Sequence, residues 1–309
     1  MNLLQKDRFN NQVATITVSV IVATYKREES LKRALKSLIN QTYDSIEIIV
    51  VDDNADNEWN KKVEAIINEI NKLHPIVYIK NKTNKGSAET RNIGINISSG
   101  EYITFLDDDD VYLPNKIKNQ IEHMIENDSD YSITDLDLYD ENERLIEKRT
   151  RKYIKESNKD NLLRYHLMYH MTGTDTLMFK KDYLLSIGGF PHINVGDEFY
   201  LIQKAIETGG IFSYLPLCDV KAYVHTETDG LSSGEGKIKG ENLLYEYKKK
   251  YFLQLSNKEI RYIKMRHYAV LAFAEVRKKN AIAFIKYSIY SFINSPCKCV
   301  SLVLSRKKQ

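Results

Sequence analysis

Four stretches of β-branched and aliphatic residues, each followed by a stretch with helical periodicity, constrain the fold of this chain more than any other feature. Strands alternating with helices predict a parallel sheet covered by helices. Because the strand-like stretches are continuously apolar, we expect both faces of the sheet to be buried. The expected strands are 17–24, 46–53, 75–81 and 101–110, and the expected helices are 29–41, 58–73, 86–98 and one from about Pro114.

Polar residues follow each of the four expected strands. Ligands of parallel α/β sheets bind beyond the carboxyl ends of the strands, so these residues are predicted to meet in one crevice. They are Thr24, Tyr25, Lys26 and Arg27 at the end of the first strand, Asp52, Asp53 and Asn54 at the end of the second, Asn84, Lys85 and Gly86 after the third, and Asp107 to Asp110 at the end of the fourth.

The four consecutive aspartates, Asp107 to Asp110, are the strongest chemical signal. Their mutual repulsion costs stability unless a cation neutralises it. Carboxylate oxygens suit Mn²⁺ or Mg²⁺, which proteins commonly hold together with substrate phosphates. The alternative is a solvated acidic turn in which Asp110 caps the next helix.

Asp53 closes the second strand, where a carboxylate can accept hydrogen bonds from a base or a ribose hydroxyl; the alternative is a simple turn. The sequence has neither the dinucleotide-binding glycine pattern nor a P-loop. Phosphates would then be held by a metal together with Arg91 and Lys85, because guanidinium binds phosphate in a bidentate way. Arg91 could equally be a solvated arginine on a helix surface.

The second half of the chain has a looser pattern. Residues 131–149 resemble a hairpin, and further strands are expected at 175–181, 211–217 and 221–225, with helices at 181–187 and 197–208. Asp197 and Glu198 begin the last of these helices, where one acts as a cap and either can serve as a general base. His225 could ligate the metal, bind diphosphate or be structural.

The charge is unevenly distributed. Residues 241–309 hold 15 Lys/Arg against 4 Asp/Glu, and the rest of the chain holds 30 against 38. This basic tail is expected to be helical, and it suits either peripheral contact with an anionic membrane or a solvated surface; no nucleic-acid motif is present. Three cysteines, without a signal peptide or a long apolar segment, predict a cytoplasmic protein.

At this point the sequence resembles glycosyltransferase family 2, the inverting nucleotide-sugar transferases with the GT-A fold. The resemblance covers 17 to about 230 and rests on VSVIVATYKR, LKSLINQTYDSIEIIVVDDNAD, NKGSAETRNIGINISSGEYITFLDDDD, and GGF followed by GDEFYL. It implies a Rossmann-like, mostly parallel α/β sheet with a helical C-terminal extension. The expected parts are an N-terminal arm (1–16), a nucleotide-sugar-binding half (17–110), an acceptor-binding half (111–235) and the basic extension (241–309).

The resemblance also implies residue roles. The base pocket would contain Ala23, Tyr25 and Asp53, and Thr24 is also expected to bind the nucleotide sugar. Asp107, Asp108 and Asp109 would form the metal and ribose site, with Asp109 as the direct metal ligand. Arg91 would lie near the sugar or diphosphate. Either Asp197 or Glu198 would deprotonate the acceptor. The order Asp-Glu departs from the frequent Glu-Asp of the family and leaves the choice between them open, with Glu198 slightly preferred.

The function expected from this resemblance is metal-dependent transfer of a sugar, with UDP as the expected nucleotide. The acceptor would be a saccharide, a lipid-linked saccharide or a protein, in the synthesis of a cell-surface polysaccharide, at the inner face of the membrane. Two alternatives remain. One is a metal-dependent nucleotidyl or phosphoryl transferase, and the other is a non-catalytic nucleotide-sugar-binding scaffold.

Overall fold

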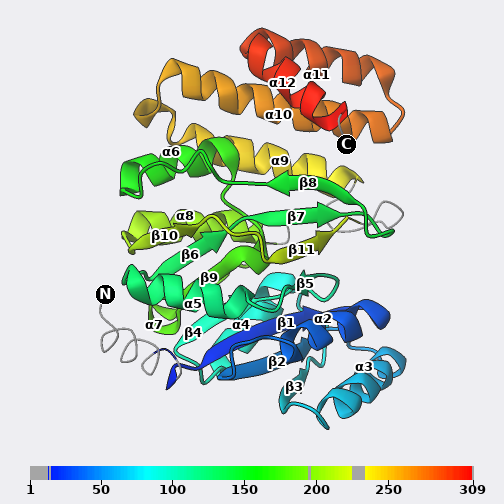
Figure 1. The fold of residues 1–309 in the computed structure, drawn as a ribbon. Coiled ribbons are helices and arrows are strands. Elements are labelled where there is room, and N and C mark those ends of the chain that lie inside the picture. The colour runs from blue at the N-terminus through cyan, green and yellow to red at the C-terminus, as the bar shows by residue number, and fades with distance from the viewer. Residues whose placement is uncertain (1–12, 14, 194–195, 225–233, 308–309) are drawn as a thin grey trace. The chain divides into compact units, whose positions relative to one another are not determined.

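The structure is a computed structural model that describes residue 13 and residues 15–193, 196–224 and 234–307. The chain divides into two compact units. The first comprises 1–159, 171–192 and 197–224, and the second comprises 160–170, 193–196 and 225–309. Figure 1 shows the elements of both units, coloured along the chain.

The first unit is built on a seven-stranded sheet with the strand order β10-β6-β9-β4-β1-β2-β3. The neighbours β4, β1, β2 and β3 run parallel, whereas β9 runs antiparallel to both β4 and β6. The predicted mostly parallel sheet is therefore confirmed. Its strands are β1 (Val18–Thr24), β2 (Ile46–Asp52), β3 (Ile76–Lys80), β4 (Tyr102–Phe105), β6 (Tyr131–Thr134), β9 (Leu177–Lys180) and β10 (Phe212–Leu215).

Helices cover the sheet on both faces, as the apolar strands predict. Val18, Val20 and Val22 of β1 belong to the core formed with α2 and α3. On the opposite face, Ile21 contacts α4 so closely that a Cβ at Gly94 would lie 2.5 Å from its Cγ2. The helices of this unit are α2 (Glu29–Ile39), α3 (Asn57–Ile70), α4 (Ser87–Ile97), α5 (Lys116–Glu126), α7 (Lys181–Ser186) and α8 (Asp197–Thr208).

A second, four-stranded sheet has the order β5-β11-β7-β8. The hairpin expected at 131–149 is only partly correct, because β6 joins the large sheet and the hairpin consists of β7 and β8. The suggestion that Asp110 caps the next helix is wrong, since β5 intervenes and Asn115 precedes α5. The strands of this sheet are β5 (Val111–Tyr112), β7 (Leu136–Tyr139), β8 (Leu145–Arg149) and β11 (Val220–Tyr223).

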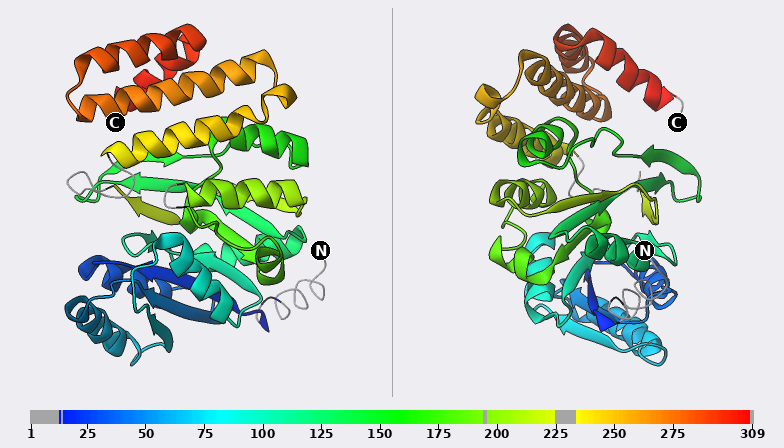
Figure 2. Two further views of the ribbon diagram at one scale, coloured as in Figure 1. Left: turned by 180° about the vertical axis from the view of Figure 1, so that it is seen from behind. Right: turned by 60° about the vertical axis from the view of Figure 1, so that its left-hand side comes forward.

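The second unit is helical. It contains α6 (Lys159–Tyr169) except for its first residue, α9 (Gly234–Lys249), α10 (Asn257–Arg277), α11 (Ala281–Asn294) and α12 (Pro296–Lys307). Helices α10 and α11 lie side by side in both views of Figure 2. The mid-chain helix α6 joins the tail helices through Arg266, whose Nη1 donates to the Met168 carbonyl at 2.8 Å. In the part of the chain that the structure describes, no helix combines the length and apolarity needed to cross a membrane.

Candidate active site

Three carboxylates from two distant segments meet at the end of β4. Asp107 and Asp110 follow β4, and Asp175 lies in the 3-10 turn η1 (Thr174–Thr176) that precedes β9. One carboxylate oxygen of each residue lies within 4.8 Å of the others. The cluster forms because β9 is antiparallel to β4, which brings the beginning of β9 to the end of β4. The backbone N–H of Asp107 donates to Oδ1 of Asp175 at 2.6 Å, which fixes the two segments together.

Burial makes ionisation of this acidic cluster costly. It raises the pKa of Asp175 to about 7, with a further contribution from the carboxylate of Asp107. Burial and the neighbouring Asp175 also raise the pKa of Asp110. Three clustered carboxylates provide the hard oxygen ligands preferred by Mg²⁺ and Mn²⁺, and a divalent cation would offset the cost of ionising them together. The residues present therefore fit a divalent cation, and the predicted ligand Asp107 is among them.

The other two aspartates of the run make different contacts. Asp108 links the ends of β4 and β1, because its Oδ2 accepts hydrogen bonds from Oγ1 of Thr24 at 2.8 Å and from the backbone N–H of Tyr25 at 3.1 Å. Burial raises the pKa of Asp108 to about 7, and the charge of Asp109 adds to the effect. Oδ2 of Asp109 pairs with Nη2 of Arg27 at 2.9 Å. His225, the remaining predicted metal ligand, lies outside the described residues.

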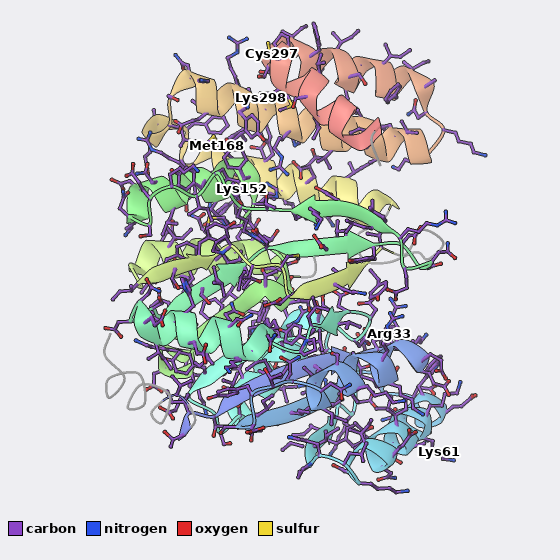
Figure 3. All side chains as sticks on the ribbon, viewed as in Figure 1. Arg33, Lys61, Lys152, Met168, Cys297 and Lys298 are labelled. Carbon is purple, nitrogen blue, oxygen red and sulfur yellow. The ribbon has the colours of Figure 1, made fainter. Side chains whose placement is uncertain are left out.

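A second arginine also reaches Asp109. Nη2 of Arg33, on α2, donates to the Asp109 carbonyl at 2.9 Å, and the guanidinium lies 4.1 Å from the centre of the Tyr223 ring. Arg33 is labelled in Figure 3. These contacts place two cations, Arg27 and Arg33, beside the acidic run. Guanidinium groups at this position can bind an anionic ligand such as a phosphate.

Asp53 is buried and organises the loop between β3 and α4. Its carboxylate accepts hydrogen bonds from the backbone N–H groups of Lys85 at 2.8 Å and Gly86 at 2.9 Å, and from Nδ2 of Asn81 at 2.8 Å. The side chain of Lys85 is exposed. At the end of β1, Ala23 is half-buried and the Tyr25 side chain is 47% exposed. The roles of these residues in a base pocket stay predictions.

Arg91 connects the acidic run to the second predicted acidic pair. Nη2 of this buried arginine lies 2.6 Å from Oδ1 of Asp107, and Nη1 lies 3.2 Å from Oδ2 of Asp197. Although burial alone would lower the pKa of Arg91, the carboxylates of Asp107 and Asp197 produce a net increase. The alternative of a solvated surface arginine is therefore wrong.

Asp197 and Glu198 occupy the first turn of α8 but have different environments. Burial raises the pKa of Asp197, although the ion pair with Arg91 opposes this effect. Oε2 of Glu198 accepts a hydrogen bond from the backbone N–H of Gly173 at 2.5 Å. Burial raises the pKa of Glu198 to about 7, and the charge of Asp197 contributes. A carboxylate with such a pKa can accept a proton near neutral pH.

Sequence reasoning missed three residues of this region as site residues: Asp175, Arg27 and Arg33. Arg27 was among the polar residues expected at the end of the first strand, but it was not assigned a role. Asp175 directly precedes the β-rich run TLMFK, but only the antiparallel pairing of β9 with β4 reveals its proximity to Asp107. The helical pattern places Arg33 on the polar face of α2 but does not predict its contact with Asp109.

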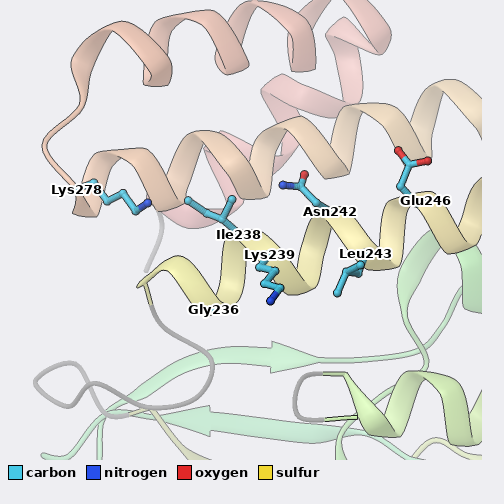
Figure 4. A pocket seen from close by; sticks show the side chains of 7 residues that line it. All are labelled: Gly236, Ile238, Lys239, Asn242, Leu243, Glu246 and Lys278. Carbon is cyan, nitrogen blue, oxygen red and sulfur yellow. The ribbon is translucent and has the colours of Figure 1, made fainter.

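A separate hollow of about 520 Å³ belongs to the helical unit. It is lined by residues of α9, among them Lys239, Asn242 and Glu246, and by Lys278 after the end of α10 (Figure 4). Among the described residues, none of the three carboxylates of the acidic cluster lines it.

The sequence is similar to that of known glycosyltransferases. A family model described as glycosyl transferase family 2 matches residues 19–184. An uncharacterized glycosyltransferase of Methanocaldococcus jannaschii is 37% identical over 157 residues, which are 50% of this chain and 53% of that protein. The Escherichia coli UDP-Glc:alpha-D-GlcNAc-diphosphoundecaprenol beta-1,3-glucosyltransferase WfaP is 43% identical over 35% of this chain and 41% of its own length. The matched region thus spans about half or less of these relatives.

Solved structures share the fold. The crystal structure of S. aureus TarS 1-349 covers 91% of this chain, and 92% of that chain is covered, with a TM-score of 0.58 and 17% sequence identity. The same protein in complex with UDP-GlcNAc gives a TM-score of 0.59 with 18% identity over 91% of this chain and 92% of that one. At this level of identity the likeness concerns the fold.

Proposed function

Because this chain belongs to glycosyl transferase family 2, we propose that it transfers a sugar from a UDP-sugar to a hydroxyl acceptor with inversion at the anomeric carbon. The observation that carries the proposal is the position of Arg91. Its guanidinium contacts Asp107 of the acidic cluster and Asp197 beside Glu198. One cation thereby joins a site suited to a metal and diphosphate with a site suited to a general base.

On the donor side, Asp107, Asp110 and Asp175 would hold Mn²⁺ or Mg²⁺. When bound, the cation acts as a Lewis acid that offsets negative charge on the departing nucleoside diphosphate. Arg91 and Arg27 supply positive charge from the protein itself, because each already pairs with an aspartate of the run. The proposed role of Asp109 as a direct ligand requires its carboxylate to leave Arg27. The loop organised by Asp53 would complete the nucleotide site.

On the acceptor side, we assign the general base to Glu198. Two features support this choice over Asp197. The carboxylate of Asp197 is engaged by Arg91, and the pKa of Glu198 is raised to about 7 by burial. Glu198 would take the proton of the acceptor hydroxyl while that oxygen attacks the anomeric carbon from the side opposite the diphosphate. The hydrogen bond from the Gly173 N–H holds the carboxylate in a fixed orientation.

The names of two relatives support a proposal for the donor and acceptor classes. WfaP is named for UDP-Glc and a diphosphoundecaprenol-linked acceptor, and a second Escherichia coli relative, WfgD, 30% identical over 125 residues, is named for the same reaction. For this chain we infer a UDP-hexose donor and a lipid-linked saccharide acceptor in the synthesis of a cell-surface polysaccharide. With such an acceptor, the reaction would take place at the cytoplasmic face of a membrane.

The first test measures the melting temperature of the purified chain with a panel of nucleoside diphosphates and nucleotide sugars, in Mn²⁺, in Mg²⁺ and in chelator. A ligand that binds the folded state raises the melting temperature by mass action. We expect stabilisation by UDP and one UDP-sugar that requires the metal. Stabilisation by no member of the panel would contradict the proposal and favour a scaffold role.

The second test identifies the products with the donor found in the first. Release of free UDP together with a sugar linkage of inverted configuration is expected. Release of pyrophosphate or orthophosphate would instead indicate a nucleotidyl or phosphoryl transferase. Donor binding without turnover on any lipid-linked, saccharide or protein acceptor would leave the scaffold as the better explanation.

A further inference from the structure

Helix α11 directs large apolar side chains outward. Ile282, Ile285, Ile289, Phe292 and Ile293 are each at least half exposed, from 50% for Ile289 to 83% for Ile282. Their spacing of three or four residues places them on one side of the helix. A helix on the surface of a water-soluble domain normally has the opposite arrangement, with its apolar stripe facing the core.

The inward side of α11 is fixed by polar and aromatic contacts to α10. Ser291 is buried, and its hydroxyl donates to the Met265 carbonyl at 2.9 Å. The ring of Tyr268 lies 5.2 Å from that of Tyr290 and 6.4 Å from that of Tyr287. These contacts determine the rotation of α11 about its axis and therefore keep the isoleucines outward.

Both ends of α11 are also held. The side chain of Asn280 accepts a hydrogen bond from the backbone N–H of Ala283 at 3.2 Å, which caps the beginning of the helix. At the other end, Nε of Arg261 donates to the carbonyl of Asn294 at 2.8 Å. A well-capped helix that exposes five large apolar side chains presents a contiguous apolar surface. Surfaces of this kind mark sites of protein or membrane interaction.

The charge of the chain segment that contains α11 favours an anionic partner. Residues 277–309 contain eight Lys/Arg and not one Asp or Glu. The side chains of Lys279, Lys286 and Lys298 are exposed, and Lys298 is labelled near the start of α12 in Figure 3. Two copies of this face would bring like charges together, which disfavours self-association. An anionic lipid surface offers both an apolar layer and complementary charge.

Residues suited to a lipid interface lie beside the isoleucines. Nζ of Lys286 lies 5.8 Å from the centre of the Tyr287 ring and 5.9 Å from that of Tyr290. Tyrosine is enriched where an apolar layer meets water, and lysine can bury its methylene chain while its ammonium group remains at the headgroups. The helix thus combines an apolar face with polar groups at its margin.

We propose that α11 lies in the interfacial layer of an anionic bilayer, with Ile282, Ile285, Ile289, Phe292 and Ile293 inserted among the acyl chains. Lys279, Lys286 and Lys298 contact the anionic headgroups. This surface is a lipid-binding site distinct from the donor and acceptor sites. It holds the chain at the membrane independently of catalysis.

The test is flotation of the full chain with vesicles, in the absence of nucleotide and acceptor. We expect binding to vesicles of phosphatidylcholine with phosphatidylglycerol, little binding to phosphatidylcholine alone, and weaker binding as salt is added. The double variant Ile285→Gln/Ile289→Gln should bind about 100-fold more weakly, since burial of each isoleucine corresponds to about a tenfold step in affinity. Lys279→Gln/Lys286→Gln should reduce both the affinity and its salt dependence.

A matched control is available in the other unit. Leu73 and Ile211 are 72% and 52% exposed, so Leu73→Gln/Ile211→Gln makes the same polar change elsewhere and should leave vesicle binding unaltered. Circular dichroism checks that each variant is folded. The dependence of wild-type binding on phosphatidylglycerol tests the proposal even if a variant does not fold. Absence of vesicle binding, or equal loss in the control, would overturn the proposal.

Self-association provides a further discriminating measurement. Sedimentation of the lipid-free chain is expected to show a monomer at micromolar concentration. A different result would assign the apolar face to a second copy of the chain. In that case the chain does not bind vesicles but forms a dimer, and Ile285→Gln/Ile289→Gln dissociates the dimer. Because the donor-induced rise in melting temperature is measured separately, failure of lipid binding and failure of the proposed transferase function are distinguishable.

Discussion

Replacement of Glu198 by Gln is expected to stabilise the chain at alkaline pH while it abolishes most of the activity. The folded chain raises the pKa of Glu198 from 4.5 to about 7, chiefly by burial. The folded state therefore binds a proton more tightly than the unfolded state does. Stability then falls as the pH rises from about 4.5 to about 7, and the loss persists at higher pH.

The size of this change in the free energy of unfolding follows from the two pKa values of Glu198. A tenfold change in proton affinity corresponds to about 1.4 kcal/mol, so the full effect at pH 8 is about 3 kcal/mol. Solvent screening at this partly exposed side chain reduces the expected value to about 2 kcal/mol. Glutamine keeps an oxygen for the hydrogen bond from Gly173 but carries no charge. We expect Glu198→Gln to raise the melting temperature by about 5 °C at pH 8 and by much less at pH 5.

The assay is thermal unfolding in chelator between pH 5 and pH 8.5, together with turnover under donor saturation. Turnover should fall by ~10² or more, a typical contribution of a general base, with donor binding retained. Glu207→Gln is the control, because Glu207 is an exposed glutamate near the end of the same helix and its change should lie within ~0.5 kcal/mol. Equal melting temperatures of wild type and Glu198→Gln at pH 8 would refute the reasoning from burial. Unchanged turnover would refute the assignment of the base.

Four further changes test other residues of the site and one turn of the fold. Asp175→Asn should raise the melting temperature in chelator and weaken Mn²⁺ binding at least ~10-fold, because one of three clustered carboxylates is removed; an unchanged Mn²⁺ titration would contradict this. Asp109→Ala should abolish metal-dependent donor binding, and normal donor affinity with normal turnover would exclude Asp109 as a ligand. Arg91→Met leaves two carboxylates without their buried cation and should cost about 3–5 kcal/mol in chemical denaturation, against much less for Arg91→Lys. Gly189→Ala should cost about 1–3 kcal/mol by the same measurement, because φ is +63° and the added Cβ would lie 2.5 Å from Oδ1 of Asn92.

The first half of the fold could be predicted from sequence because its signals are local. The apolar period of each strand and helix between 17 and 98 reports directly on burial, and the observed bounds of β1, α2, β2, α3, β3 and α4 differ from the expected ones by only a few residues. The parallel order of strands then follows from their alternation with helices. The acidic run Asp107 to Asp110 follows the fourth apolar stretch, so the same pattern predicts that it lies at the end of a strand.

The helical tail was only partly predictable. The basic tail was expected to be helical, and α10, α11 and α12 confirm this. The expectation of a basic surface did not reveal that α11 turns its isoleucines outward. That rotation depends on Ser291 and the tyrosines packing on α10, and a helical period alone cannot tell which of two faces is the inner one.

The sequence by itself determined which chemical groups this protein has, and the order in which its parallel strands present them. Only the tertiary structure decided how those groups combine. Asp175 reaches Asp107, 68 positions away, through an antiparallel strand pair, and Arg91 meets Asp197 across 106 positions. Local periodicity records the burial of a residue but carries no information on its partner across such separations. The physical reason is that strand pairing and the docking of α8 depend on the packing of the whole sheet, which no single segment encodes.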